Sequence, residues 1–177
     1  PIEYYNYSVN LENKTLAELI LCNASNSNIT NITIIGSDTY KNNELLVYYT
    51  SNSNFKDINS SYNYEGIYIR SSPDNNLSSI TTSFNNWNGI SLSSSNFNTL
   101  QNITASSNSQ RGIYRSSSNS NTLQNITANS NNYGIRLSSS SNNNITDSTI
   151  TSSSNYGIYI DSVSDNNLFY NNFLNNT

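Results

Sequence analysis

The chain has 177 residues, of which only 10% are charged, and its formal net charge is −4 with no histidine. This length fits one domain, and seven Lys and Arg residues scattered along an acidic chain argue against a nucleic-acid partner. No apolar run reaches the roughly 18 residues that a membrane-spanning helix needs. We therefore expect a protein without nucleic-acid partners or membrane spans.

The first 27 residues do not follow the pattern of the rest of the chain. Leu16 and Leu19 lie at helical spacing, so we predict a short helix over residues 14–21. We interpret residues 1–27 as an N-terminal cap or assembly segment, and residues 28–177 as the main domain. A cap is favoured because a repeat protein must cover the open apolar end of its first unit. A contact arm for a partner is the alternative.

The main domain repeats a phrase of glycine, isoleucine, any residue and, in most copies, an aliphatic residue. The copies begin, at steps of about 23 residues, at Gly66, Gly89, Gly112, Gly134 and Gly157. A second asparagine-led phrase keeps the same step, beginning at Asn75, Asn98, Asn121, Asn143 and Asn166. Three short strands per unit, with no helix between them, predict an all-β solenoid of about six coils. The asparagine column is a candidate structural ladder, with side-chain amides bonding between coils.

The repeated phrase resembles the repeats of the pectate-lyase-like superfamily, and among these the NosD-like repeats of exported surface proteins. The resemblance covers roughly residues 29–177. It implies a single-stranded right-handed parallel β-helix and a protein that is secreted after removal of a leader. It does not imply one activity, because the superfamily includes lyases, hydrolases, epimerases, adhesins and shell proteins.

Aromatic residues gather in the outward positions of the repeat or just before its glycine. Such rings could stack on sugars or pack against another subunit, and ordinary strand propensity on a solvated face is the alternative interpretation. The residues of this candidate ligand or subunit face are Tyr68, Tyr114, Tyr159, Trp87, Tyr133 and Tyr156.

Few residues carry chemistry. The acidic residues hardly share a repeat phase, there is no histidine to act as a base or metal ligand, and Cys22 is the only cysteine. We therefore predict no catalytic residues, no metal site, no cofactor and no enzymatic activity. Arg115 occupies a position where other copies of the repeat have an inward aliphatic residue, and we expect a local bulge to turn it toward solvent.

Two further features bear on assembly and modification. Apolar residues near both ends of the chain are candidate assembly surfaces for head-to-tail contacts, namely Tyr4, Tyr5, Leu16, Leu19, Leu168, Phe169 and Phe173. Asn-x-Ser/Thr acceptors are frequent, and the candidate N-glycosylation sites are Asn28, Asn31, Asn76, Asn102, Asn125 and Asn144.

Low charge, the scarcity of catalytic groups and the apolar ends lead to one functional hypothesis and two alternatives. The first is a non-enzymatic extracellular structural protein that assembles head to tail into a surface filament, sheath or layer. The second is a carbohydrate-binding adhesin that uses the tyrosine-rich face. The third, which rests on fold analogy alone, is a polysaccharide-active enzyme.

Overall fold

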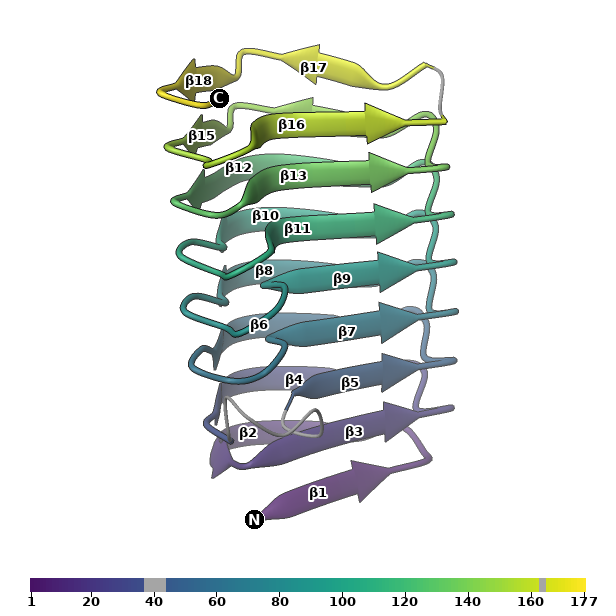
Figure 1. Ribbon diagram of the computed structural model, residues 1–177. Coiled ribbons are helices and arrows are strands. Elements are labelled where there is room, and N and C mark those ends of the chain that lie inside the picture. The colour runs from purple at the N-terminus through teal and green to yellow at the C-terminus, as the bar shows by residue number, and fades with distance from the viewer. Residues whose placement is uncertain (37–43, 163–164) are drawn as a thin grey trace.

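The computed structural model describes residues 1–36, 44–162 and 165–177, and all of its regular elements are β-strands. The chain winds into a stack of coils, with one sheet in front and one behind in Figure 1. The front sheet, here sheet A, contains β1 (Ile2–Tyr5), β3 (Glu18–Cys22), β5 (Leu45–Tyr48), β7 (Ile67–Arg70), β9 (Ile90–Ser93), β11 (Arg111–Ser116), β13 (Tyr133–Ser138) and β16 (Tyr156–Asp161).

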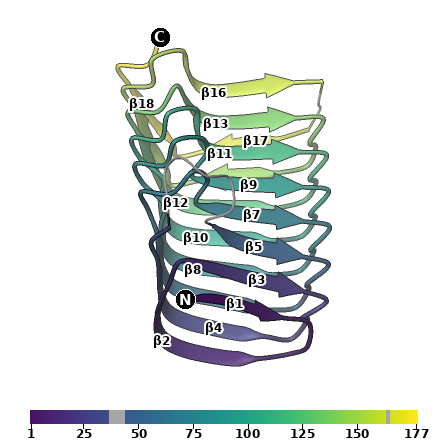
Figure 2. The ribbon, with the colours of Figure 1, turned by 60° about the horizontal axis from the view of Figure 1, so that its bottom comes forward.

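Sheet B lies behind it and has ten strands, because its last two coils each contribute two short ones. It contains β2 (Asn10–Leu16), β4 (Asn28–Ile34), β6 (Asn54–Ser60), β8 (Asn76–Thr81), β10 (Thr99–Thr104), β12 (Thr122–Asn129), β14 (Asn144–Thr146), β15 (Thr149–Thr151), β17 (Asn167–Phe169) and β18 (Asn172–Leu174). The tilted view in Figure 2 shows the same strand order along both sheets. The fold is the predicted right-handed parallel β-helix of about six turns.

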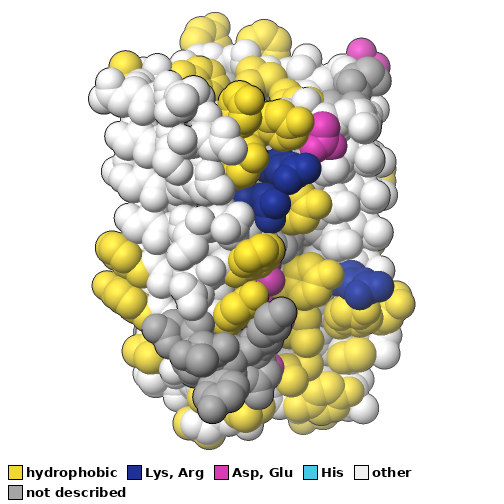
Figure 3. Space-filling model, in the orientation of Figure 1, with side chains coloured by type: hydrophobic (Ala, Val, Ile, Leu, Met, Phe, Trp, Pro, Cys, Tyr) yellow, Lys and Arg dark blue, Asp and Glu magenta, His cyan; other side chains and the backbone are white. Residues whose placement is uncertain are grey.

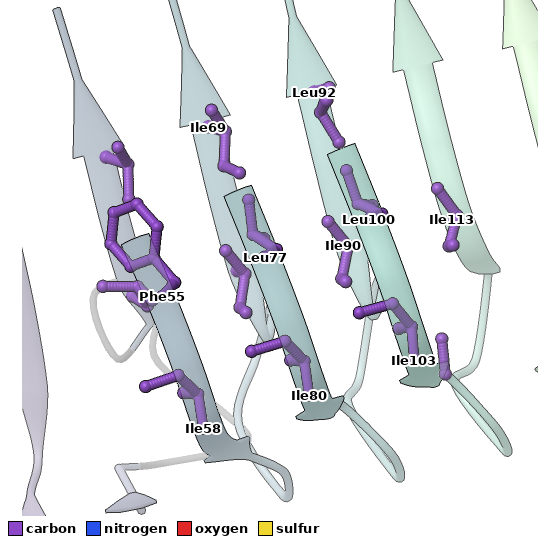
Figure 4. Close-up of a cluster of buried hydrophobic side chains, with 14 of the residues drawn as sticks. Phe55, Ile58, Ile69, Leu77, Ile80, Ile90, Leu92, Leu100, Ile103 and Ile113 are labelled. Atoms are coloured by element: carbon purple, nitrogen blue, oxygen red, sulfur yellow. The ribbon is translucent and has the colours of Figure 1, made fainter. Parts of the chain in front are cut away.

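Every strand pairs in parallel with the equivalent strand of the next coil, which stacks like residues on like residues. Ile90 pairs with both Ile67 and Ile113, for example, and Leu100 pairs with Leu77 and Leu123. The inward side chains of the two sheets therefore meet as columns of isoleucine and leucine that are excluded from water (Figure 4). This continuous apolar interior is the main source of cohesion between coils.

The corners between sheets A and B are closed by side chains that accept hydrogen bonds from the backbone of the preceding coil. At one position Ser72 N–H donates to Ser95 Oγ at 3.1 Å, and Ser95 N–H donates to Ser118 Oγ at 3.1 Å. Beside it, Asn75 N–H donates to Asn98 Oδ1 at 2.9 Å. Buried backbone donors that face away from the sheets are satisfied in this way.

The asparagine column predicted from the sequence continues this pattern along the stack. Asn98 N–H donates to Asn121 Oδ1 at 2.7 Å, and Asn143 N–H donates to Asn166 Oδ1 at 2.8 Å. A second ladder, which the sequence analysis did not identify, lies at the opposite corner. There Asn85 and Asn108 accept and donate in the same manner, with Asn85 N–H donating to Asn108 Oδ1 at 3.0 Å.

The repeated glycine is required by close packing between coils. No glycine among the described residues has a positive φ, so a left-handed turn is not the reason for it. A Cβ atom on Gly112 would lie only 2.6 Å from the carbonyl oxygen of Gly134 in the next coil. Any larger residue would push the coils apart at this point.

The helix predicted over residues 14–21 is wrong. This stretch belongs to β2 and β3, which pair in parallel with β4 and β5. Leu16 and Leu19 are buried in the core, so they are not available as an assembly surface. The apolar spacing that resembled a helix arises because the chain leaves one sheet and enters the other between these two residues.

Arg115 also lies where the sequence analysis did not expect it. No bulge turns it outward: it pairs with Leu92 and Leu137 in the regular register of sheet A, and its side chain is fully buried. The guanidinium donates to Asn143 Oδ1 at 2.6 Å through Nη1, while Nε and Nη2 have no partner among the described residues. Burial lowers the pKa of Arg115 to about 9.

Candidate functional site

The outer face of sheet A carries a band of aromatic and charged side chains. Figure 3 shows hydrophobic, basic and acidic groups gathered along this face, beside paler surface built from other residue types. Parallel register explains the band, because each outward position forms a column along the stack. One column, just before the glycines, contains Glu65, Asn88 and Arg111; the next contains Tyr68, Ser91 and Tyr114.

Two adjoining hollows lie in this band, and we call them together the sheet A groove. The first has a volume of about 270 Å³ and the second about 350 Å³, and both are lined by Glu65, Tyr68 and Trp87. The first extends to Asn88, Ser91 and Tyr114, and the second to Glu44 and Tyr64. The stacked rings of Tyr64 and Trp87, with centroids 6.4 Å apart, form one wall. Aromatic walls of this kind suit the apolar faces of sugar rings.

Glu65 is the best-connected acidic group of the groove. Its Oε1 accepts hydrogen bonds from the Ser91 hydroxyl and, at 3.2 Å, from Asn88 Nδ2. Asn88 also donates to Ser91 Oγ at 3.0 Å, so the three side chains hold one another in place. Burial raises the pKa of Glu65 above its ordinary value, against the opposing effect of the two donors.

Glu44 extends the acidic side of the groove. Burial, together with the charges of Glu65 and Glu18, raises the pKa of Glu44 to about 8. Glu18, at the start of β3, is buried, and this burial raises its pKa. The groove therefore contains two half-buried carboxyl groups whose pKa values are raised by burial.

Most of the aromatic residues predicted from the sequence border this groove or continue its band. Tyr68, Trp87 and Tyr114 line the first hollow. Further along the stack, Tyr133, Tyr156 and Tyr159 form a cluster whose ring centroids lie 5.2–5.9 Å apart. Whether these residues bind a ligand stays a prediction, as does the assignment of the face.

The predicted glycosylation sites lie elsewhere. Asn31, Asn76, Asn102 and Asn125 are exposed, whereas Asn28 and Asn144 are half-buried, and all six belong to sheet B. Two of them bond to each other, since Asn125 Nδ2 donates to Asn102 Oδ1 at 2.7 Å. Their modification stays a prediction.

The sequence analysis missed Glu44 and Glu65 as site residues. It compared acidic residues only for a shared phase with the later coils. The degenerate first coil could have located Glu44. Leu45 pairs with Ile67, so Glu44 occupies the position that Gly66 has in the next coil. Glu65 lies one residue further back, so the two acids come from adjacent coils at one end of the groove.

Within the parts of the chain that the structure describes, no three His, Cys, Asp or Glu side chains are grouped as metal ligands, and no helix could span a membrane. Comparison with known proteins then decides the family. The profile of "Periplasmic copper-binding protein (NosD)" matches residues 5–177. The chain belongs to the NosD family. A search of curated proteins finds no match.

The copper in the family's description does not fit the residues of this NosD chain. Copper sites in proteins are built mainly from imidazole, thiolate and thioether groups. The chain has no histidine, no methionine and one cysteine, Cys22. No chemical step is therefore assigned to copper here.

Two solved structures that share this fold are enzymes. The periplasmic alginate epimerase AlgG aligns with a TM-score of 0.75 at 16% identity, over 93% of this chain and 43% of its own. The A-module of the Azotobacter vinelandii mannuronan C-5 epimerase AlgE4 aligns with a TM-score of 0.64 at 14% identity, over 89% of this chain and 55% of its own. This chain thus spans about half the length of each.

These neighbours contradict our prediction that the protein is not an enzyme. That prediction treated the regular solenoid with few acidic groups as a purely structural object, yet the same solenoid has epimerase activity in AlgG and AlgE4. At this identity the likeness establishes the fold, so the activity of this chain has to be argued from its own groove. The family is described as periplasmic and AlgG is a periplasmic epimerase, which agrees with an exported protein.

Proposed function

We propose that this NosD-family protein is an exported enzyme that binds a polysaccharide in the sheet A groove and acts on it by acid–base chemistry. The observation that carries the proposal is the pair of half-buried carboxyl groups with raised pKa, Glu44 and Glu65, beside an aromatic wall. A raised pKa brings a carboxyl group closer to the working pH, where general acid–base catalysis needs it to give and accept a proton.

Glu65 is the residue we assign to proton transfer. Its carboxyl group lines both hollows, and Asn88 and Ser91 fix its orientation. Trp87 and Tyr68 would hold the sugar ring against it by stacking. Glu44 lies at the same end of the groove, where burial and then the charge of Glu65 raise its pKa. The fold shared with alginate epimerases favours proton exchange on the sugar ring over cleavage of the chain.

The test is to incubate the purified chain with alginate in deuterated water. Deuterium incorporation into the polymer measures proton exchange, and new reducing ends measure cleavage. The proposal predicts deuterium incorporation that is lost in Glu65→Gln. The absence of both signals, with alginate bound in the groove, would contradict the enzymatic assignment and leave a binding module.

Self-association is a second candidate, supported by the apolar side chains of the last coil. Leu168, Phe169 and Phe173 on β17 and β18 are all exposed. A second copy of the chain that stacked on this edge would bury them. Light scattering over a concentration series tests this, with loss of association in Phe173→Lys as the expected result. A monomer at every concentration would contradict it.

A further inference from the structure

Two arginine side chains lie on the outer face of sheet A just beyond Glu65. The Arg111 guanidinium carbon lies 4.6 Å from the ring centroid of Tyr114, and that of Arg136 lies 5.8 Å from the same ring. Both also lie near the ring of Tyr133, at 5.9 and 5.8 Å. Two like charges therefore share the faces of the same two tyrosines, which fixes the planes of both guanidinium groups.

The two arginines differ in how their charge is compensated. Arg136 Nη2 forms an ion pair with Asp161 Oδ2 at 2.9 Å, and Ser138 donates to the other oxygen of that carboxylate at 2.6 Å. Arg111 has no ion pair within the described parts of the chain, and its hydrogen bond to Asn88 Oδ1 is 3.4 Å long. Its Nε is buried without a partner among the described residues. Arg111 is thus a partly desolvated cation without an ion pair in this part of the structure.

No acidic side chain forms an ion pair with Arg111 within the described parts of the chain. The acid in the same column is Glu65, which attracts Arg111 electrostatically but whose hydrogen bonds come from Ser91 and Asn88. Burial and the charge of Arg136 lower the pKa of Arg111, and Tyr114, Tyr133 and Glu65 oppose this in part. A desolvated guanidinium is most stable against a carboxylate or sulfate, which its planar fork binds through two hydrogen bonds.

We propose that Arg111 binds an anionic substituent of the polysaccharide, with Arg136 adding charge and Tyr114 a stacking surface, so that the groove selects acidic over neutral glycans. The proposal rests on the proposed function for its location. Asn88 bonds to both Arg111 and Glu65, so the two charged residues are separated by one side chain. The anionic group would therefore lie next to the sugar that meets Glu65. Carboxylate and sulfate share the required chemistry.

Matched pairs of polymers test this selectivity. Alginate is compared with its neutral propylene glycol ester, and carboxymethylcellulose with hydroxyethylcellulose; cellulose sulfate separates sulfate from carboxylate. We expect the wild-type chain to bind the charged member of each pair about tenfold more tightly or better, as one charge-assisted bidentate contact allows. The net charge of −4 would oppose this preference, so it cannot arise from the protein's overall charge.

The decisive variant is Arg111→Gln, matched by Arg70→Gln. Arg70 is an exposed arginine of the same sheet that also lies over a ring, 5.3 Å from the centroid of Tyr48, but outside the groove. We expect Arg111→Gln to abolish the preference for charged polymers, Arg111→Lys to keep part of it and Arg70→Gln to keep all of it. Circular-dichroism melting of each variant separates loss of recognition from loss of folding.

Two outcomes would overturn the inference: equal binding of charged and neutral polymers by the wild-type chain, or full discrimination in a folded Arg111→Gln. These outcomes differ from failure of the proposed function. Selective binding without deuterium exchange removes the enzymatic assignment and leaves the anion subsite in place. Exchange on neutral and charged polymers alike removes the subsite and leaves the enzyme.

Discussion

The outer faces of sheets A and B are built on the same interior but use their polar groups differently. On sheet B, polar side chains of successive coils bond to each other: Gln101 Nε2 donates to Gln124 Oε1 at 3.3 Å, and Gln124 Nε2 donates to Asp147 Oδ2 at 3.2 Å. On sheet A, unlike residues occupy successive coils, as in the column of Glu65, Asn88 and Arg111. The sheet B side chains satisfy one another, whereas the mixed column includes Arg111, which has no ion pair among the described residues.

The strongest test of this contrast replaces one carboxylate on each face. Glu65→Gln on sheet A should lower turnover of the polysaccharide by about 10²–10⁴-fold, the usual contribution of one acid–base group. Asp147→Asn, on the outer face of sheet B, should leave turnover unchanged because Asp147 bonds to Gln124 and does not line the groove. Deuterium incorporation under identical conditions measures both. Equal losses in the two variants would mean that the faces do not differ in function.

The inner faces of the two sheets also differ, because that of sheet A contains a buried charged residue, Arg115. Arg115→Leu should stabilise the fold by about 3 kcal/mol, because an apolar residue replaces a buried cation that lacks an anionic partner. The gain should be largest at neutral pH, where Arg115 is protonated, and should shrink above its pKa of about 9. Urea unfolding of both proteins at pH 7 and pH 10 measures this difference. A destabilised variant would mean that the guanidinium has a partner that holds the core together.

Substitutions at the corners between the sheets should change the stability of the fold more than substitutions on an outer face. Asn98→Ala removes the acceptor of Asn75 N–H and leaves that buried donor unpaired, which should cost about 2 kcal/mol. Gln101→Ala, on the exposed face of sheet B, should change stability by less than about 0.5 kcal/mol. The midpoints of urea unfolding compare the two. If Asn98→Ala were as stable as Gln101→Ala, the asparagine ladder would not contribute to the stability of the fold.

The smallest effect concerns the pH dependence of the acidic end of the groove. The pKa of Glu44 is raised from 4.5 to about 8, so the folded state keeps a proton that the unfolded state releases. The stability from this residue is then fully present below about pH 4.5 and falls as the pH rises toward 8. Glu44→Gln should flatten that part of the profile, and melting temperatures between pH 4.5 and pH 9 would reveal it. If the dependence of the melting temperature on pH were unchanged by the substitution, Glu44 would be exposed to solvent.

Much of the architecture could be predicted from the sequence because the same packing and hydrogen-bond contacts recur in every coil of the solenoid. The glycine and asparagine columns each reflect one contact that recurs between neighbours, as at Gly112 and Asn98. The first coils could not be read in this way. Residues 14–21 carry no glycine phrase, and a crossing between sheets mimics helical spacing over so short a stretch.

The site escaped prediction for the opposite reason. Its residues break the repeat: Glu44 lies in a degenerate coil, and Arg111 precedes a glycine where other coils have Asn88 or Tyr133. A search for repeated columns passes over residues that occur in one coil only. Parallel register, once known, places Glu65 and Arg111 two coils apart on one face, with Asn88 bridging them.

The account's central claim is that sheet A, and not sheet B, binds the ligand. Titration of the ¹⁵N-labelled chain with an alginate oligosaccharide, followed by NMR, tests it most directly, and the indole of Trp87, the only tryptophan, is a ready reporter. We expect saturable shifts at Trp87, Glu65 and Arg111, with the side-chain amides of Gln101 and Gln124 unmoved. Shifts confined to the sheet B glutamines, or none at saturating oligosaccharide, would contradict the claim.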